Sequence, residues 1–277
     1  MQNRYVGDIG DFGKFGLLKA LCQPDGGGEK LTLGVVWYLV PDESHNNDGK
    51  HINYLRPTAD NFRKFRSCDP MLYDKLSQIV QDGNRDVKHI REDGVLLSDT
   101  VYYERELSYH GLPNNSSAAR ENRLAYRTEW VKGALETTGK CDIVFVDPDN
   151  GLGVSVERHQ AKGPKYVYYD ELQPYLEREQ SLIIYHHIGR NGTAGKQIQT
   201  RFLEIKDQLN VSNNVFALLF GRGSLRAYFV VPGKAHADSV LEKARRLITQ
   251  PWGSHFALVY PNCKSMTPLQ LNNNLLF

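Results

Sequence analysis

The sequence is poor in cysteine and has no long apolar run. Its four cysteines stand far apart, without a CxxC pair, at Cys22, Cys68, Cys141 and Cys263. This spacing argues against a zinc site and against a disulfide framework, and it favours reduced thiols in a cytoplasmic protein. The first residues lack the apolar segment of a signal peptide, so we expect none. No apolar run approaches about 18 residues, so we expect no membrane span.

The sequence also lacks a strong charge of either sign. It has 34 basic and 32 acidic residues, for a net charge of +2. This balance neither requires nor excludes a nucleic-acid partner, because a basic surface would have to come from local clustering. The chain has 277 residues, of which 40% are hydrophobic. That is enough for one large α/β domain with a sizeable core. The oligomeric state is not predicted.

Stretches typical of strands alternate with stretches typical of helices. Buried strands are predicted at 31–40, 142–147, 181–189 and 255–261, and two more across 215–233, joined at 221–223. Helices are predicted at 13–22, 119–136 and 239–250. This order predicts a single α/β domain over 1–277, with a mainly parallel, doubly wound sheet and helices on both faces. Residues from about 56 to 120 mix charged helical stretches with short strand-like pieces, and we expect an inserted, mostly helical subdomain there.

Reactive side chains follow three of the predicted strands where each strand ends. They are Asp42, His45, Asp48 and His51 after the first strand, Asp147 and Asp149 after the second, and His186 and His187 after the third. In an open α/β sheet, ligands bind beyond the carboxyl ends of the strands, so neighbouring strands would gather these groups into one cleft. Adjacent strand residues point to opposite faces, so at most one of the two histidines faces it. Acids at strand ends also make turns and cap helices, and that structural reading stays open.

The opening stretch RYVGDIGDFGKFG is rich in glycine, which costs backbone entropy. Such a segment usually lies against a ligand or another backbone, so we expect it to fold over the cleft. The alternative is structural: Asp11 would cap the following helix and Lys14 would lie on its solvent face.

Three motifs occur in order along the chain. They are RYVGDIGDFGKF near the start, DPDN at 147–150 after a buried strand, and GSLRAYFVVPG at 223–233. They resemble the opening Y-R-H-x-F-H-A-G-N-x-A-D-V-L-K-H, the catalytic D-P-P-Y and the late G-S-G-M-x-V-I-N-P-P of the RlmJ-type ribosomal RNA adenine methyltransferases. The resemblance extends over nearly the whole chain. It implies a Rossmann-like methyltransferase-superfamily sheet.

The resemblance also implies a function. These enzymes use S-adenosylmethionine to methylate an adenine amine in nucleic acid. The resemblance implies that Lys14 holds the cofactor carboxylate, that Asp147 accepts a hydrogen bond from the target amine, and that the Pro148 carbonyl takes its second proton. The expected cofactor-binding residues are Gly7, Asp8, Asp11, Lys14 and Asp42, and the expected catalytic residues are Asp147, Pro148, Asp149, Asn150, His186 and His187.

The chain departs from the family pattern at two places. After the first strand the family has D-T-H-A-G-A-G, whereas this chain has VPDESHNNDGKH with one glycine. That bulky, acidic loop disfavours S-adenosylmethionine in its usual pose. Asn150 replaces the tyrosine that stacks on the target base, a role open instead to Tyr168, Tyr169 or Tyr185. The resemblance therefore bears more strongly on the fold than on the reaction.

A second reading of the same residues is metal-dependent phosphodiester hydrolysis of nucleic acid or a nucleotide. Asp48, Asp147 and Asp149, with one of the two histidines, would bind Mg²⁺ or Mn²⁺. The metal would polarise a phosphoryl oxygen or activate water. The phosphate contacts would come from Arg190, Lys196, Arg222 and Arg226. A third reading is a binding module without catalysis, which the acids at the strand ends disfavour because they repel phosphate.

Overall fold

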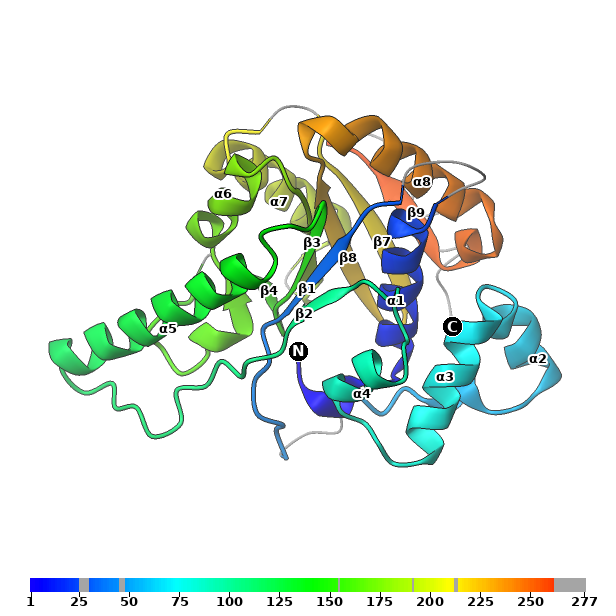
Figure 1. Cartoon of the computed structure of the whole chain (residues 1–277), viewed down its shortest axis with the longest axis horizontal. Helices are drawn as coiled ribbons and strands as arrows, with labels where there is room; N and C mark the ends of the chain where they lie inside the picture. Colours follow the sequence, from blue (N-terminus) through cyan, green and yellow to red (C-terminus); the bar gives the residue numbers. More distant parts are fainter. Residues whose placement is uncertain (25–29, 45–47, 154, 191, 212–213, 262–277) are drawn as a thin grey trace.

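The computed structural model describes residues 1–24, 30–44, 48–153, 155–190, 192–211 and 214–261. It shows an α/β protein in which helices flank a seven-stranded mixed sheet (Figure 1). This architecture is compatible with a Rossmann-like fold. His45 and Cys263 lie outside the described residues. Within these ranges, no helix is long and apolar enough to cross a bilayer.

The sheet has the strand order β2-β1-β3-β6-β8-β7-β9. Its strands are β1 (Leu33–Trp37), β2 (Val101–Tyr103), β3 (Ile143–Asp147), β6 (Ser181–His187), β7 (Phe216–Arg222), β8 (Ser224–Val231) and β9 (Phe256–Val259). Strands β2, β1, β3 and β6 run parallel, which confirms the expected parallel arrangement for this part of the sheet. Strand β8 is antiparallel to β6 and β7, and β9 is antiparallel to β7, so this half of the sheet is antiparallel and the sheet as a whole is mixed, not mainly parallel. The hairpin between β7 and β8 turns at Gly223, with φ +72°.

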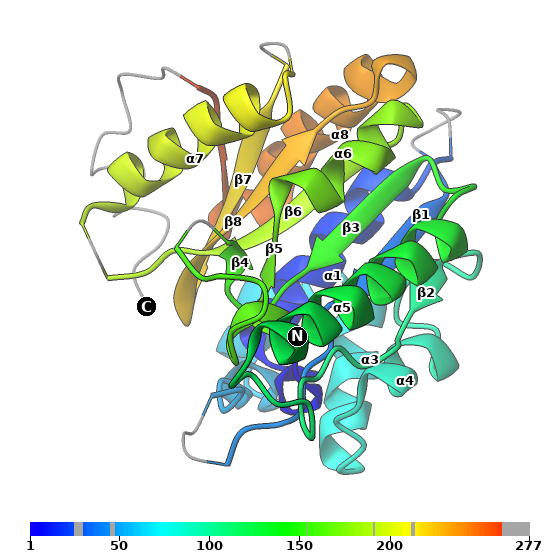
Figure 2. The same ribbon diagram turned by 90° about the vertical axis from the view of Figure 1, so that its left-hand side faces the viewer.

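Helices cover both faces of the sheet (Figures 1 and 2). Helices α1 (Ile9–Cys22), α3 (Pro70–Gln81), α4 (Val87–Glu92) and α8 (Ala237–Thr249) contribute to one core cluster, and the short α2 (Ala59–Asn61) precedes α3. Helices α5 (Ser117–Thr137), α6 (Tyr169–Glu177) and α7 (Ala194–Gln208) contribute to the other. A second, two-stranded sheet pairs β4 (Gly151–Leu152) with β5 (Tyr166–Val167).

The alternation of side chains along the strands decides which polar groups meet. In β3, Phe145 belongs to the core cluster on the α1 face, whereas Val146 belongs to the cluster on the opposite face. Because a strand repeats every two residues, Asp147 follows Phe145 onto the α1 face. In β6, Tyr185 lies on the α1 face, so His187 lies there too and His186 points to the other face.

The region predicted as an inserted subdomain, about 56–120, contains α2, α3, α4 and β2 and ends within the start of α5. Leu72 of α3 and Ile90 of α4 belong to the same core cluster as Phe12 of α1. Strand β2 pairs with β1 at the edge of the main sheet. The region therefore packs onto the α1 face and adds a strand to the sheet. Its status as a separate subdomain stays a prediction.

Helix α1 begins at Ile9, four residues before the predicted start. The Asp8 carboxylate caps it by accepting hydrogen bonds from the backbone amides of Gly10 (2.7 Å) and Asp11 (3.0 Å). Lys14 is only 4% exposed. The alternative reading, in which Asp11 caps the helix and Lys14 faces solvent, is therefore wrong.

A stripe of glycines brings α1 close to its neighbours. Gly10, Gly13 and Gly16 face the side chains of Arg226, Phe220 and Trp252, and an added Cβ would lie 2.5, 2.5 and 2.2 Å from them. The glycines are therefore explained by close packing. The second half of the glycine-rich stretch forms the first turns of helix α1. These turns line the cleft from one side and do not fold over it.

We predict that Gly16→Ala destabilises the protein by about 1–3 kcal/mol, because the new methyl group overlaps the buried ring of Trp252. At an open helical site the same change would be stabilising. Urea unfolding measures the effect. The control is Gly139→Ala, whose Cβ meets no atom closer than 3.4 Å and should change stability by less than about 0.5 kcal/mol. Equal effects of the two changes would contradict the packing role.

Candidate functional site

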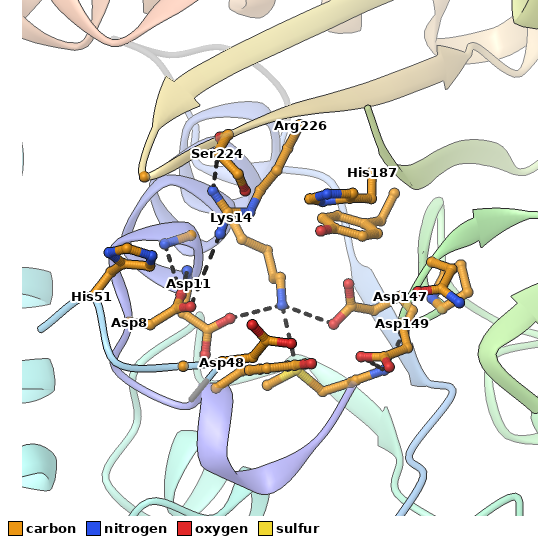
Figure 3. A pocket seen from close by; sticks show the side chains of 18 of the residues that line it. Asp8, Asp11, Lys14, Asp48, His51, Asp147, Asp149, His187, Ser224 and Arg226 are labelled. Carbon is orange, nitrogen blue, oxygen red and sulfur yellow. Dashed lines mark hydrogen bonds and ion pairs between the residues drawn. The ribbon is translucent and has the colours of Figure 1, made fainter. Parts of the chain in front are cut away.

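The candidate site lies where the strand order reverses, between the carboxyl ends of β1 and β3. Trp37 and Asp147 are paired there in register. In open α/β sheets this reversal is where ligands bind. A pocket of about 370 Å³ opens there, and Figure 3 shows its side chains. Nine of the twelve residues predicted as catalytic, cofactor-binding or metal-binding line it: Asp8, Asp11, Lys14, Asp48, Asp147, Pro148, Asp149, Asn150 and His187. His51, from the loop after the first strand, lines it as well.

Three predicted site residues do not line this pocket. Gly7, with φ +81°, packs against Val80. Asp42 is exposed and accepts a hydrogen bond from the backbone amide of Arg4 at 3.2 Å. His186 points to the opposite face because it is one residue before His187 on the strand.

Lys14 is the central group of the pocket. Its Nζ donates to Asp11 Oδ1 at 2.7 Å and to Asp147 Oδ2 at 2.8 Å (Figure 3). Burial alone would lower the pKa of Lys14, but the charges of Asp11 and Asp147 outweigh burial and raise it above its ordinary value. The two carboxylates therefore favour the charged form of Lys14, and its ammonium group fixes them in turn.

Asp11 and Asp147 differ in the position of the oxygen atom that does not bind Lys14. The Oδ2 atom of Asp11 is buried and accepts no hydrogen bond from the described residues. Burial raises the pKa of Asp11 to about 6, although the charge of Lys14 opposes this. Asp147 turns one oxygen toward Lys14 and the other toward the side of the pocket where His187 lies (Figure 3).

Asp149 is held by a second set of donors. Lys165 Nζ lies 3.0 Å from its Oδ2, and Gln2 donates to the same oxygen at 2.9 Å. Burial would raise the pKa of Asp149, but the nearby amino group of Met1 and the Lys165 ammonium hold it below its ordinary value. Oδ1 of Asp149 is buried, lies 3.9 Å from the Met1 amino group and accepts no hydrogen bond within the described ranges. It could accept a hydrogen bond from a ligand in addition to this ion pair.

Met1 fills the crevice between β1 and β3. Its amino group donates to the backbone carbonyls of Tyr38 (3.0 Å) and Asp147 (3.1 Å). Its Sδ lies 3.6 Å from Lys14 Nζ. Met1 and Lys165 were not predicted as site residues. Met1 contacts Asp147 and Lys165 contacts Glu43, and no local sequence pattern indicates contacts between residues so far apart in the chain.

The loop after Asp147 lies against the end of β6. The Asn150 carbonyl accepts a hydrogen bond from the backbone amide of His187 at 3.3 Å. Gly151 follows with φ +112°, and a Cβ there would lie 2.3 Å from His186 Nδ1. Only glycine allows this close approach. The contacts of Asn150 and Gly151 with β6 therefore help to position Asp147 and Asp149, which precede them in the loop.

Aromatic and cationic groups also line the pocket. Tyr185 lines it, whereas Tyr168 and Tyr169 contact other parts of the protein. Arg190 and Arg226 also line it, but Arg222 binds His255 and Lys196 lies in another pocket. Burial and the Arg226 charge lower the pKa of His187, so its ring is neutral at neutral pH and offers one donor and one acceptor.

The size and the lining of the pocket are compatible with S-adenosylmethionine, but not in the expected pose. Its volume is within the usual range for ligand sites, about 300–1,000 Å³. The buried oxygens of Asp11 and Asp149 that accept no hydrogen bond from the described residues are of a kind that suits the ammonium and hydroxyl groups of the cofactor. Lys14 already binds two carboxylates, and Met1 fills the crevice at the strand reversal. Lys14 would therefore not serve as the partner of the cofactor carboxylate, and Met1 would stay between the ligand and the strand reversal.

The predicted metal ligands do not fit a divalent ion in this arrangement. Asp147 and Asp149 each bind an ammonium group, and the Asp48 side chain is 63% exposed. In the part of the chain that the structure describes, no group of three His, Cys, Asp or Glu residues is placed to hold a metal. Metal binding would require Lys14 or Lys165 to leave its carboxylate.

Comparisons with known proteins add no family assignment. No family model matches the sequence, and no curated protein matches it. The fold and the pocket together define an α/β protein with a polar pocket at the carboxyl edge of its sheet.

We predict that Asp11→Asn alters the pH dependence of stability. Burial raises the pKa of folded Asp11 from 3.8 to about 6. Its contribution to stability is therefore fully present below about pH 4 and is lost as the pH rises toward about 6. Asparagine does not titrate. The free energy of unfolding of the variant relative to wild type should therefore rise across this window, by on the order of 2 kcal/mol.

Urea unfolding at several pH values between these limits measures the difference. The control is Asp170→Asn, whose side chain is 61% exposed and should show no comparable trend. A difference between Asp11→Asn and wild type that is constant with pH would contradict the assignment.

Proposed function

We propose that the chain is a methyltransferase-like enzyme that acts on an amine of a nucleic acid base. The observation that supports this most is the arrangement of Asp147. Its carboxylate stands at the end of β3, beside the strand reversal, with one oxygen fixed by Lys14 and the other turned into the pocket. A carboxylate held in this way is suited to orient a hydrogen-bond donor.

In this proposal, the second oxygen of Asp147 accepts a hydrogen bond from the target amine. The carbonyl of Pro148, which also lines the pocket, accepts the other amine proton. The amine lone pair is then free to face the methyl donor. Such positioning contributes most of the rate in a one-step transfer, because the reacting atoms are held in line.

Tyr185 is the group best placed to contact the base. Its ring lines the pocket on the same face as Asp147 and packs against Tyr228, with ring centroids 5.9 Å apart. An aromatic side chain fixed by packing offers a stacking surface to any base. Tyr185 would thus replace the tyrosine that is absent from DPDN.

S-adenosylmethionine supplies an electrophilic methyl group when it is bound. The residues that would hold it are Asp11 and Asp149, through the buried oxygens that accept no hydrogen bond from the described residues. We rank methyl transfer above metal-dependent hydrolysis. To bind Mg²⁺ or Mn²⁺, Asp147 or Asp149 would have to exchange its lysine partner for the metal.

We predict that the protein transfers a labelled methyl group from S-adenosylmethionine to RNA or single-stranded DNA. Asp147→Asn should lower kcat/KM about 10- to 100-fold, because it weakens a hydrogen bond of the charged type worth about 1.5–3 kcal/mol. Scintillation counting of precipitated nucleic acid measures transfer, and calorimetry measures cofactor binding.

The control is Asp170→Asn, which removes an exposed carboxylate from α6 and should leave activity unchanged. Thermal unfolding of each variant verifies that it is folded. If wild type neither binds S-adenosylmethionine nor labels nucleic acid, or if Asp147→Asn keeps full activity, the proposed function is wrong.

A further inference from the structure

A second pocket, of about 310 Å³, opens at the carboxyl end of β6 on the opposite face of the sheet. His186 of β6 lines it, together with Lys196 and Arg201 of α7. Tyr166, Ser155, Thr200 and Gln197 complete its polar lining. The adjacent His187 faces the first pocket, so only the end of one strand separates the two sites.

The two pockets differ in charge. Five aspartates line the first pocket. None of the described residues that line the second carries a carboxylate. Lys196 is exposed and makes no ion pair with a described residue, whereas Arg201 pairs with Glu204, which is outside the pocket lining. The second pocket therefore combines two cations with several neutral donors.

His186 adds a neutral donor to this set. Its Nδ1 accepts a hydrogen bond from the Leu152 backbone amide at 3.1 Å, so the ring proton is on Nε2. Burial and the neighbouring Arg201 lower the pKa of His186 to about 3, which keeps the ring neutral at physiological pH. A neutral N–H beside a lysine and an arginine is a combination suited to phosphate oxygens.

We propose that the second pocket binds a backbone phosphate of the nucleic acid strand whose base enters the first pocket. This inference rests on the proposed function and specifies its substrate as a strand instead of a free nucleotide. A single nucleotide in the first pocket would leave the second unused. A strand crossing the end of β6 would place a base in the first pocket and a phosphate in the second, and the exposed Arg190, which lines the first pocket, would contact the chain between them.

The test is the binding of a short, labelled, single-stranded RNA by fluorescence anisotropy across a range of salt concentrations, without S-adenosylmethionine. Lys196→Ala should make the slope of log K against log[salt] shallower by about 0.7, which corresponds to about a fivefold loss at about 0.1 M salt. The matched control is Lys88→Ala, an exposed lysine on α4, which should leave the slope and affinity unchanged. The double variant Lys196→Ala/Arg201→Ala should lose more, and thermal unfolding verifies its fold.

Asp147→Asn should lose methyl transfer but keep the dependence of RNA affinity on Lys196, because Asp147 does not line the second pocket, and this separates the inference from the proposed reaction. If Lys196→Ala and the double variant bind RNA with wild-type affinity and slope, the phosphate site is wrong. A last measurement follows the melting temperature in the presence of inorganic phosphate. If phosphate raises the melting temperature of wild type through Lys196, while RNA affinity does not depend on Lys196, the pocket takes a free anion and the assignment to a strand is overturned.

Discussion

The ammonium group of Lys14 is the interaction on which the candidate site depends. Each charge taken out of water loses hydration worth several kcal/mol, and this loss is offset only where partners lie at hydrogen-bond distance. Lys14 meets Asp11 at 2.7 Å and Asp147 at 2.8 Å. Without the ammonium, two buried carboxylates would face each other uncompensated. Lys14 therefore fixes the first turns of α1 against the end of β3, and it sets the direction of the Asp147 carboxylate.

The rest of the fold makes this contact possible. Small residues on α1, such as Gly13 against Phe220, let the helix lie close enough for Lys14 to reach β3. The two-residue period of β3 turns Asp147 toward α1, and the positive φ of Gly151 lets the following loop rest on β6. The pocket is thus built at the ends of regular elements, which hold side chains more precisely than free loops do.

Part of this site follows from the sequence. A run of buried residues ending in Asp147 predicts a carboxylate at the sheet edge, and strand alternation predicts that only one of His186 and His187 shares its cleft. The burial of Lys14 does not follow, because a lysine in an amphipathic helix is ordinarily solvated and its partner Asp147 is 133 residues away. The glycines of the first helix were also misleading, since close helix packing and ligand contact call for the same residue. The resemblance to RlmJ-type enzymes is one of sequence motifs, and it stays a prediction.

The most direct test of this account is the protonation state of Lys14. Nitrogen-edited NMR of the lysine side chains, with Lys14→Arg to assign the signal, follows each ammonium as the pH rises. The account predicts that Lys14 stays protonated after the exposed lysines have titrated at about pH 10.4, because two carboxylates hold its proton. A Lys14 signal that titrates with the exposed lysines, or below them, would contradict the central ion pair and the orientation of Asp147 that depends on it.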